Sequence, residues 1–361
     1  MLGAVTLSWY ACDLKTGVIL EELHSLTPQG AFGCKLGMST TANFNVDIAG
    51  APPQWVDATQ PGRSMLVAVD QQASVPIWAG LILTRQRGSS DQAAFGCATP
   101  EAYLDRRYTG DVSYAVATDQ AVIMTGLGTA LAVNAPNFVF DAPNTGTTTT
   151  YAVQDGDDRT ILSTWQELMG QQGGPEWTIT PVWQDAAQTT IKLVITIRAT
   201  VGTQSTQPEA VFDLPGCVAD YAQLESYESD KGATDVLAWG DGQGATRLKS
   251  AVHSATTLLA QGWPSWVYRF TPAAGLTDPT QLDAHAAEAL AQMQAGSSAW
   301  TIDAVASRAP RIGSDWGLGD TVRLQVATSP GHPSGVDMTA RAYAWQLDPT
   351  ADKVTPILVE G

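Results

Sequence analysis

The strongest constraint on the fold is an alternation of apolar and polar residues that recurs along the chain. Its clearest case covers residues 177–197, where Trp177 and Ile179 alternate with polar positions, and so does every second residue from Ile191 to Ile197. A period of two residues places successive side chains on opposite faces of a strand. The segment therefore predicts an antiparallel hairpin with one buried face, turning at residues 185–188.

Similar alternation marks both ends of the chain. Residues 1–10 alternate as well and lack a positively charged start, which favours a strand over a signal peptide. Gly80 interrupts an apolar stretch, and a glycine there indicates a bulge or a bend in a barrel. We expect strands in these segments: 44–48, 65–69, 76–83, 211–214, 218–227, 234–239, 300–304, 322–326, 338–347 and 353–359.

Two segments have clear helical spacing. The first runs over residues 161–169, and we expect Asp157 and Asp158 at its start to favour the helix dipole. The second begins with Asp278 as N-cap and Pro279 as the first helical residue, and it ends before Gly296. Weaker helical spacing occurs at 100–107 and 119–132, and residues 249–261 allow no assignment.

These patterns together predict a mixed, β-dominated (α+β) protein, with β-rich parts at both ends and mixed segments between them. No period of 20 to 50 residues repeats, which excludes a solenoid or a propeller. The longest strongly apolar stretch, residues 77–83, is far shorter than the roughly 20 residues of a membrane-spanning helix. We therefore expect no membrane segment and synthesis in a cytoplasm.

Charge excludes one class of function. The chain has 361 residues with 36 acidic against 19 basic side chains, a net charge of −17. A protein that binds nucleic acid needs Lys and Arg to displace counterions from phosphates, so a conventional nucleic-acid binder is excluded. Residues 111–220 are the most acidic third, at −9. The acidic excess has two interpretations: it keeps an abundant protein soluble, or it lines a passage for a polyanion.

Motifs with a fixed catalytic spacing are missing from the sequence. There is no G-x-S-x-G, HExxH or G-x-x-x-x-G-K-[ST], and the four cysteines and four histidines are too scattered for a metal site or a nucleophile with its base. The sequence therefore predicts no catalytic, cofactor-binding or metal-binding residue, and no enzyme. A glycosidase with two paired carboxylates stays open, because such pairs form in space and not in sequence.

Several short segments, taken in order, resemble the minor tail proteins of actinobacteriophages, which belong to the phage baseplate-hub, or tail-associated, superfamily. Each covers only a few residues, but the ordered set spans most of the chain. The segments are Pro76–Gly80, Gln171–Ile179, Ala238–Gly242, Leu282–Ala286, Trp316–Val322, Leu347–Pro349 and Val354–Pro356.

The resemblance implies a homotrimeric structural protein of the virion, at the tip of a long phage tail. Two β-barrel-like hub domains in each subunit would form a pseudo-sixfold ring that adapts the hexameric tail to a threefold tip. The implied partners are the distal tail or tail tube protein, the tape measure protein and other tail-tip or receptor-binding proteins; no cofactor is implied. By analogy the domains are 1–102 (first barrel), 103–210 (α+β), 211–250 with 299–361 (second barrel) and 251–298 (helical insertion).

This resemblance also gives the acidic residues a role. DNA that leaves the capsid passes through the hub without specific binding, and a lumen of carboxylates would not hold it. We expect the acidic residues of 111–220 to contribute most to that lining. The candidates are Asp155, Asp157, Asp158, Glu176 and Asp185.

One alternative keeps the β-rich fold but changes the function. A carbohydrate-binding tail or surface module would use exposed tryptophans to stack on sugars. The 12 tryptophans distinguish the two hypotheses. In a hub they are buried in cores and subunit contacts, whereas in a sugar-binding module they line one exposed groove.

Overall fold

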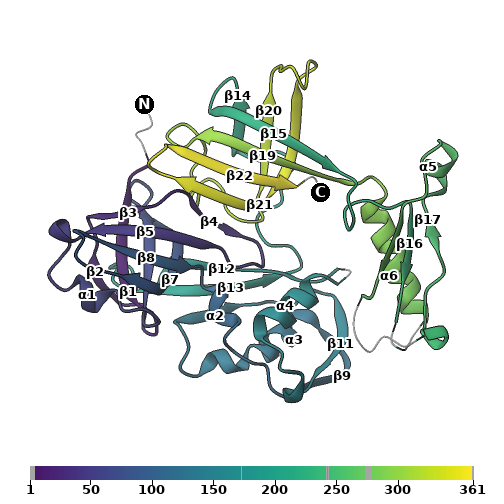
Figure 1. The fold of residues 1–361 in the computed structure, drawn as a ribbon, viewed down its shortest axis with the longest axis horizontal. Helices are drawn as coiled ribbons and strands as arrows, with labels where there is room; N and C mark the ends of the chain where they lie inside the picture. The colour runs from purple at the N-terminus through teal and green to yellow at the C-terminus, as the bar shows by residue number, and fades with distance from the viewer. Residues whose placement is uncertain (1–4, 172, 241, 243, 273–278, 360–361) are drawn as a thin grey trace. The chain divides into compact units, whose positions relative to one another are not determined.

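A computed structural model describes residues 5–171, 173–240, 242, 244–272 and 279–359 (Figure 1). Three residues used above, Gln172, Asp241 and the expected N-cap Asp278, lie outside them. Strands form 44% of the chain and helices 17%, which confirms the mixed, β-dominated class. The chain divides into two compact units. Unit 1 comprises residues 1–169, 173–221 and 301–361, and unit 2 comprises residues 170–172 and 222–300.

The N-terminal part of unit 1 is a seven-stranded antiparallel sheet with the strand order β2-β1-β6-β7-β8-β5-β3. The expected hairpin of β6 and β7 is present, with Leu66 opposite Gly80. A short helix, α1 (Trp55–Ala58), lies between β5 and β6 in sequence. The strands are β1 (Leu7–Asp13), β2 (Ile19–Glu22), β3 (Leu26–Pro28), β5 (Thr41–Asp47), β6 (Ser64–Asp70), β7 (Val75–Gln86) and β8 (Gln92–Ala98).

An aromatic cluster fills one face of this sheet. Trp78 is fully buried, and its ring centroid lies 5.3 Å from that of Phe32 and 5.4 Å from that of Phe44. Its indole N–H donates to the Gly33 carbonyl at 3.1 Å. Gly80 makes room for this ring, because a Cβ at position 80 would lie 2.2 Å from Cη2 of Trp78. The interpretation of Gly80 as a bulge was wrong, since the register shifts of β7 fall elsewhere.

A second seven-stranded sheet, mostly in unit 1, is built from the C-terminal strands in the order β14-β20-β21-β22-β19-β15. Its seventh strand, β4 (Phe32–Lys35), comes from the N-terminal region and pairs with β21, Trp345 opposite Cys34 (Figure 1). The other strands are β14 (Val211–Leu214), β15 (Val218–Ser226), β19 (Ser297–Val305), β20 (Thr321–Val326), β21 (Val336–Asp348) and β22 (Lys353–Val359).

Neither large sheet closes on itself within the described residues. The hydrogen-bonded order ends at β2 and β3 in the first sheet, and at β14 and β15 in the second. The β-rich ends expected from the sequence are therefore present as open sheets and not as closed barrels.

The middle of unit 1 is mixed, as expected. The hairpin of β12 and β13 pairs Trp177 with Ile197 and Trp183 with Ile191, and β13 buries every second residue. Parallel pairing with β10 extends it to three strands, and β9 pairs with β11. The elements are α2 (Glu101–Leu104), β9 (Val112–Asp119), α3 (Gln120–Leu127), β10 (Phe138–Asp141), β11 (Thr148–Val153), α4 (Ile161–Met169), β12 (Glu176–Trp183) and β13 (Ile191–Arg198).

Unit 2 is small. A three-stranded sheet in the order β17-β16-β18 packs against the long helix α6. Its core consists mainly of small and aliphatic side chains, among them Ala233, Val236, Leu282 and Ala286. The elements are β16 (Asp235–Ala238), β17 (His253–Ser254), α5 (Thr256–Ala260), β18 (Val267–Phe270) and α6 (Pro279–Met293).

Candidate functional site

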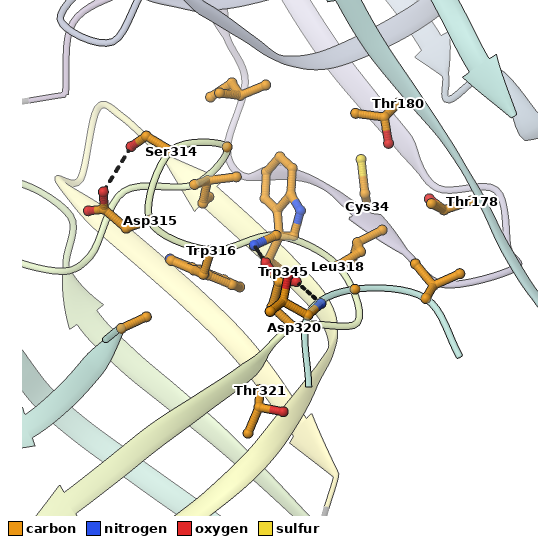
Figure 2. Close-up of a pocket in the computed structure, with 18 of the residues that line it drawn as sticks. Cys34, Thr178, Thr180, Ser314, Asp315, Trp316, Leu318, Asp320, Thr321 and Trp345 are labelled. Carbon is orange, nitrogen blue, oxygen red and sulfur yellow. Dashed lines mark hydrogen bonds between the residues drawn. The ribbon is translucent and has the colours of Figure 1, made fainter. Parts of the chain in front are cut away.

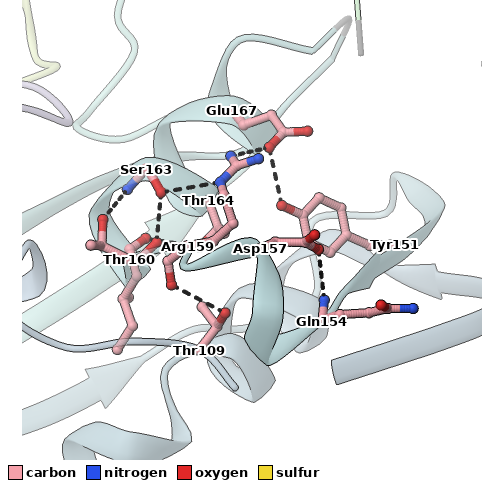
Figure 3. A network of polar contacts seen from close by, with 10 residues as sticks. Thr109, Tyr151, Gln154, Asp157, Arg159, Thr160, Ser163, Thr164 and Glu167 are labelled. Atoms are coloured by element: carbon pink, nitrogen blue, oxygen red, sulfur yellow. Dashed lines mark hydrogen bonds and ion pairs between the residues drawn. The ribbon is translucent and has the colours of Figure 1, made fainter. Parts of the chain in front are cut away.

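Three of the five predicted channel residues share one exposed turn. Asp155, Asp157 and Asp158 are all exposed, in the turn that precedes α4. Figure 3 shows Asp157 in this turn. The carboxylate of Asp157 accepts from the Gln154 N–H at 2.9 Å, so it caps this turn and not α4. Thr160 caps α4 instead, since its hydroxyl accepts from the Ser163 N–H at 3.1 Å. The expected placement of the aspartates at the start of α4 was wrong.

An ion pair joins Arg159, just before α4, to Glu167 on that helix. Arg159 donates to Glu167, which also accepts from the Tyr151 hydroxyl at 3.2 Å (Figure 3). Burial, together with the nearby Glu167 carboxylate, raises the pKa of Tyr151 well above its usual value. Glu167 is therefore committed to internal contacts, whereas Asp155 and Asp158 form no ion pair among the described residues.

Glu176 and Asp185 lie at opposite ends of the β12–β13 hairpin. Glu176 forms a bidentate ion pair with Arg341, with N–O distances of 2.8 and 2.6 Å, and also accepts from the Val201 N–H at 2.8 Å. Asp185 closes the hairpin turn by accepting from the N–H and hydroxyl of Thr189, both at 3.2 Å. The structure thus groups the three aspartates before α4 but places Glu176 and Asp185 apart from each other.

A cavity in the described part of unit 1 has a volume of about 670 Å³ (Figure 2). Thr178 and Thr180 of β12 line one side, and Trp316 and Trp345 come from the C-terminal region. Its wall contains many hydroxyl groups and apolar side chains. Such a surface suits an uncharged ligand or a polypeptide segment.

Two carboxylates and the thiol of this cavity are held by internal contacts or burial, whereas Glu209 on its wall is exposed. Asp320 accepts from the N–H groups of Gly317 and Thr203, at 2.6 and 2.5 Å, and Asp315 accepts from the Arg311 N–H at 2.8 Å. Burial, with a further contribution from the charge of Glu101, raises the pKa of the Cys34 thiol well above its usual value. Cys34 therefore stays protonated and is a poor nucleophile. Asp315 and Asp320 thus hold turns in place and are not free to act on a ligand.

The comparisons with known proteins concern the fold. No family model and no curated protein sequence matches the chain. Among solved structures, the 43 kDa tail protein of prophage MuSo2 from Shewanella oneidensis aligns with a TM-score of 0.60 at 10% identity, covering 98% of both chains. A tail protein from Neisseria meningitidis aligns with a TM-score of 0.59 at 12% identity, covering 99% of this chain and 97% of that one.

A third structure agrees with these two. Prophage tail protein gp18 from Listeria monocytogenes aligns with a TM-score of 0.55 at 9% identity, over 98% of this chain and 94% of that one. The chain has the fold of phage tail proteins. The resemblance to tail proteins is confirmed at this level, and an actinobacteriophage origin stays a prediction.

In this tail-protein fold the tryptophans are mostly buried. Eight of the 12 are buried, and Trp183 and Trp239 are half-buried. Trp263 and Trp266, both in unit 2, are exposed at 42% and 51%. They differ from the other ten tryptophans, which are buried or half-buried. The sequence analysis did not select them, although two tryptophans in a short Gly-Trp-Pro-Ser-Trp stretch gave a usable signal.

Two further observations concern ligands and membranes. The described residues contain no group of three or more His, Cys, Asp or Glu side chains that could hold a metal ion. Over the same residues, no helix has both the length and the apolar character needed to cross a bilayer.

Proposed function

We propose that the chain is a structural protein of a phage tail and forms the homotrimeric hub at the tail tip. The observation that carries this proposal is the fold similarity to tail proteins, which extends over at least 98% of the chain. A similarity limited to one sheet would suit many β-rich proteins, whereas this one includes both seven-stranded sheets and the segments between them.

The contacts between the two large sheets of unit 1 suit a subunit of a rigid ring. Strand β4 joins the C-terminal sheet through pairing with β21, and the Glu176–Arg341 ion pair links β12 to the same strand. These connections fix the two large sheets in one unit. We propose that the two sheets alternate around a threefold axis, and that their outer faces contact the tail tube protein, the tape measure protein and receptor-binding proteins.

The role we propose is non-enzymatic. It is supported by the state of the cavity, where Asp315 and Asp320 hold turns and the thiol of Cys34 stays protonated. The location we propose is the tail tip of the virion, after synthesis in the cytoplasm of the host.

The trimer is tested by the mass of the full chain in solution. Light scattering after size exclusion, over a tenfold range of concentration, is expected to give about 114 kDa for three chains of 38.1 kDa each. If the protein is monomeric, the measurement is repeated with the tail tube protein added. A chain that stays monomeric in the presence of that protein contradicts the hub.

The acidic passage is a separate part of the proposal, and it now depends on the turn at Asp155, Asp157 and Asp158. Changing all three to Lys in phage particles is expected to slow DNA ejection, because cations at the lumen bind phosphates, and added salt should relieve the effect. Equal ejection rates in the variant and in the unmodified phage would remove these residues from the lumen. The matched control reverses three exposed carboxylates of the N-terminal region: Asp47, Asp57 and Asp91.

A further inference from the structure

Unit 2 presents two exposed indole rings from one loop. Trp263 and Trp266 lie between α5 and β18, and their ring centroids are 5.3 and 6.0 Å from that of Tyr227. The rings of Trp263 and Trp266 are inclined to that of Tyr227 by 54° and 71°, so the first contact is tilted and the second is edge-on. An aromatic pair of this kind is attractive.

The backbone of this loop is held at several points. The Trp266 carbonyl accepts from the N–H groups of Thr234 and Asp235, at 2.9 and 3.1 Å, and the Trp266 N–H donates to the Thr234 hydroxyl at 2.8 Å. The Ser265 hydroxyl donates to Asp235 at 2.5 Å, and the Trp263 N–H donates to the Leu258 carbonyl at 3.1 Å. The two tryptophans are therefore fixed in position although their rings are exposed.

Tyr227 is fixed as well. A Cβ at Gly232 would lie 2.3 Å from Cδ2 of Tyr227, and one at Gly296 would lie 3.1 Å from the same atom. Both glycines are therefore needed to admit the ring. The Tyr227 hydroxyl donates to the Gln294 carbonyl at 3.4 Å. Two glycine backbones and one hydrogen bond thus position the ring against which the tryptophans rest.

The size of this patch indicates the class of ligand. At 42% and 51% exposure, the two indoles present roughly 200 Å² to solvent, because a tryptophan buries at most about 250 Å². A stable protein interface takes about 800 Å² from each partner. Even with the exposed Val267 beside it, the patch is too small for the core of such an interface. It matches the apolar C–H face of one or two sugar rings.

The charged side chains near the rings further restrict the class of ligand. Glu228 and Asp230 are exposed in the turn that follows Tyr227, and Lys231 is the one basic residue of that turn. Exposed carboxylates accept hydrogen bonds from hydroxyl groups, whereas they repel an anionic polysaccharide. Arg269 is exposed on β18, two residues after Val267, so acidic and basic groups are balanced near the rings. Such a neighbourhood both accepts and donates hydrogen bonds, and it favours an uncharged ligand that is rich in hydroxyl groups.

We propose that Trp263, Trp266 and Tyr227 form a binding site for an uncharged glycan, with pyranose rings stacked on the two indoles. The site is independent of the hub function, because it belongs to unit 2 and uses none of the contacts that hold the two large sheets together. A hub with this site would contact polysaccharide on the cell surface or in the cell wall.

The test titrates the full-length protein with two neutral oligosaccharides, the tetramers of N-acetylglucosamine and of glucose, by isothermal titration calorimetry. Saturable binding of at least one of them is expected, and a tetramer of galacturonate should bind more weakly. Changing Trp263→Ala or Trp266→Ala should lower the affinity about tenfold or more, as for an aromatic residue at the centre of a binding site. Trp239→Phe, in the same unit, is the matched control and should bind as the unmodified protein does.

Three results would overturn the glycan site. The first is the absence of saturation by either neutral tetramer up to about 10 mM. The second is an affinity of the Trp263→Ala and Trp266→Ala variants equal to that of the unmodified protein. The third is tighter binding of the anionic tetramer than of both neutral ones. Circular dichroism of each variant shows that unit 2 is still folded. None of these results changes the mass of the assembly in solution, so failure of the glycan site and failure of the hub are distinguishable.

Discussion

Units 1 and 2 differ in whether they expose tryptophan. Unit 2 exposes two of its four, Trp263 and Trp266, although its Trp300 is buried, whereas every tryptophan of unit 1 is buried or half-buried. In unit 1, Trp78, Trp165 and Trp177 are fully buried and contact other rings. In unit 2, Trp263 and Trp266 are exposed, while the core beneath the sheet is made mainly of smaller residues. The difference teaches that the tryptophans of this chain serve two purposes: those of unit 1 define the fold, and the exposed pair of unit 2 is available to a ligand.

The largest expected effect is at Trp78. Trp78→Ala removes a ring that contacts Trp9, Phe32 and Phe44, and it leaves a cavity in the first sheet. We expect the free energy of unfolding to fall by about 4 kcal/mol. Chemical denaturation followed by circular dichroism measures this loss. An effect no larger than that of Trp263→Ala would break the contrast between the two units.

A second prediction concerns a buried carboxyl group of unit 1. Glu101 on α2 is only 2% exposed; one oxygen accepts from the Ile179 N–H at 3.3 Å, and the other has no hydrogen-bond partner among the described residues. Burial raises the pKa of Glu101 to about 7 from its ordinary 4.5. The folded protein therefore holds this proton to a higher pH than the unfolded chain does.

The sign of the pH dependence follows from that difference. Between pH 4.5 and about 7 the folded state binds more protons than the unfolded state, so the stability contributed by neutral Glu101 falls as the pH rises through this interval. Glu101→Gln removes the ionisation. The stability of the variant relative to the unmodified protein should rise by about 3 kcal/mol across the interval and then level off. A constant difference between pH 4.5 and 8 would contradict a buried, protonated Glu101.

The third prediction concerns the ion pair that links β12 to β21. Arg341 donates to both oxygens of Glu176 and also to the carbonyls of Val201 and Gly319, at 3.1 and 3.2 Å. Arg341→Met leaves a partly buried carboxylate without its partner, and we expect a loss of about 2 kcal/mol. Asp185→Asn, in a turn at the other end of the hairpin, is the control and should change stability much less. If both variants lose the same free energy of unfolding, the Glu176–Arg341 pair contributes no more to stability than the turn at Asp185.

Local features of unit 1 and unit 2 were predictable because their signals are local. The alternation from Ile191 to Ile197 gave β13, and the spacing after Pro279 gave α6. Each pattern is set by the side chains of one segment, and hydrophobic burial selects the same period in the folded protein.

Contacts between distant segments were not predictable. The pairing of Phe32–Lys35 with β21 joins residues more than 300 positions apart, and no local pattern in either segment specifies the other. The same holds for the Glu176–Arg341 pair, so Glu176 was selected for its charge alone. Gly80 was misinterpreted for this reason too, because its cause is the position of the Trp78 indole, which only the folded chain defines.

The smallest effect on stability is expected at the exposed tryptophans, and it sharpens the contrast between the units most. Trp263→Ala and Trp266→Ala each remove one ring contact with Tyr227 and a ring that is already about half in water, so each should cost about 1 kcal/mol or less. If these rings bind glycan, the same changes lower the affinity for the neutral tetramer strongly. Trp263 and Trp266 would then contribute to glycan affinity and little to stability, whereas Trp78 contributes to stability alone. Denaturation and calorimetry on the same variants measure the two quantities. If Trp266→Ala instead destabilises the protein as much as Trp78→Ala does, the exposed pair is part of the core of unit 2, and the division between the units is wrong.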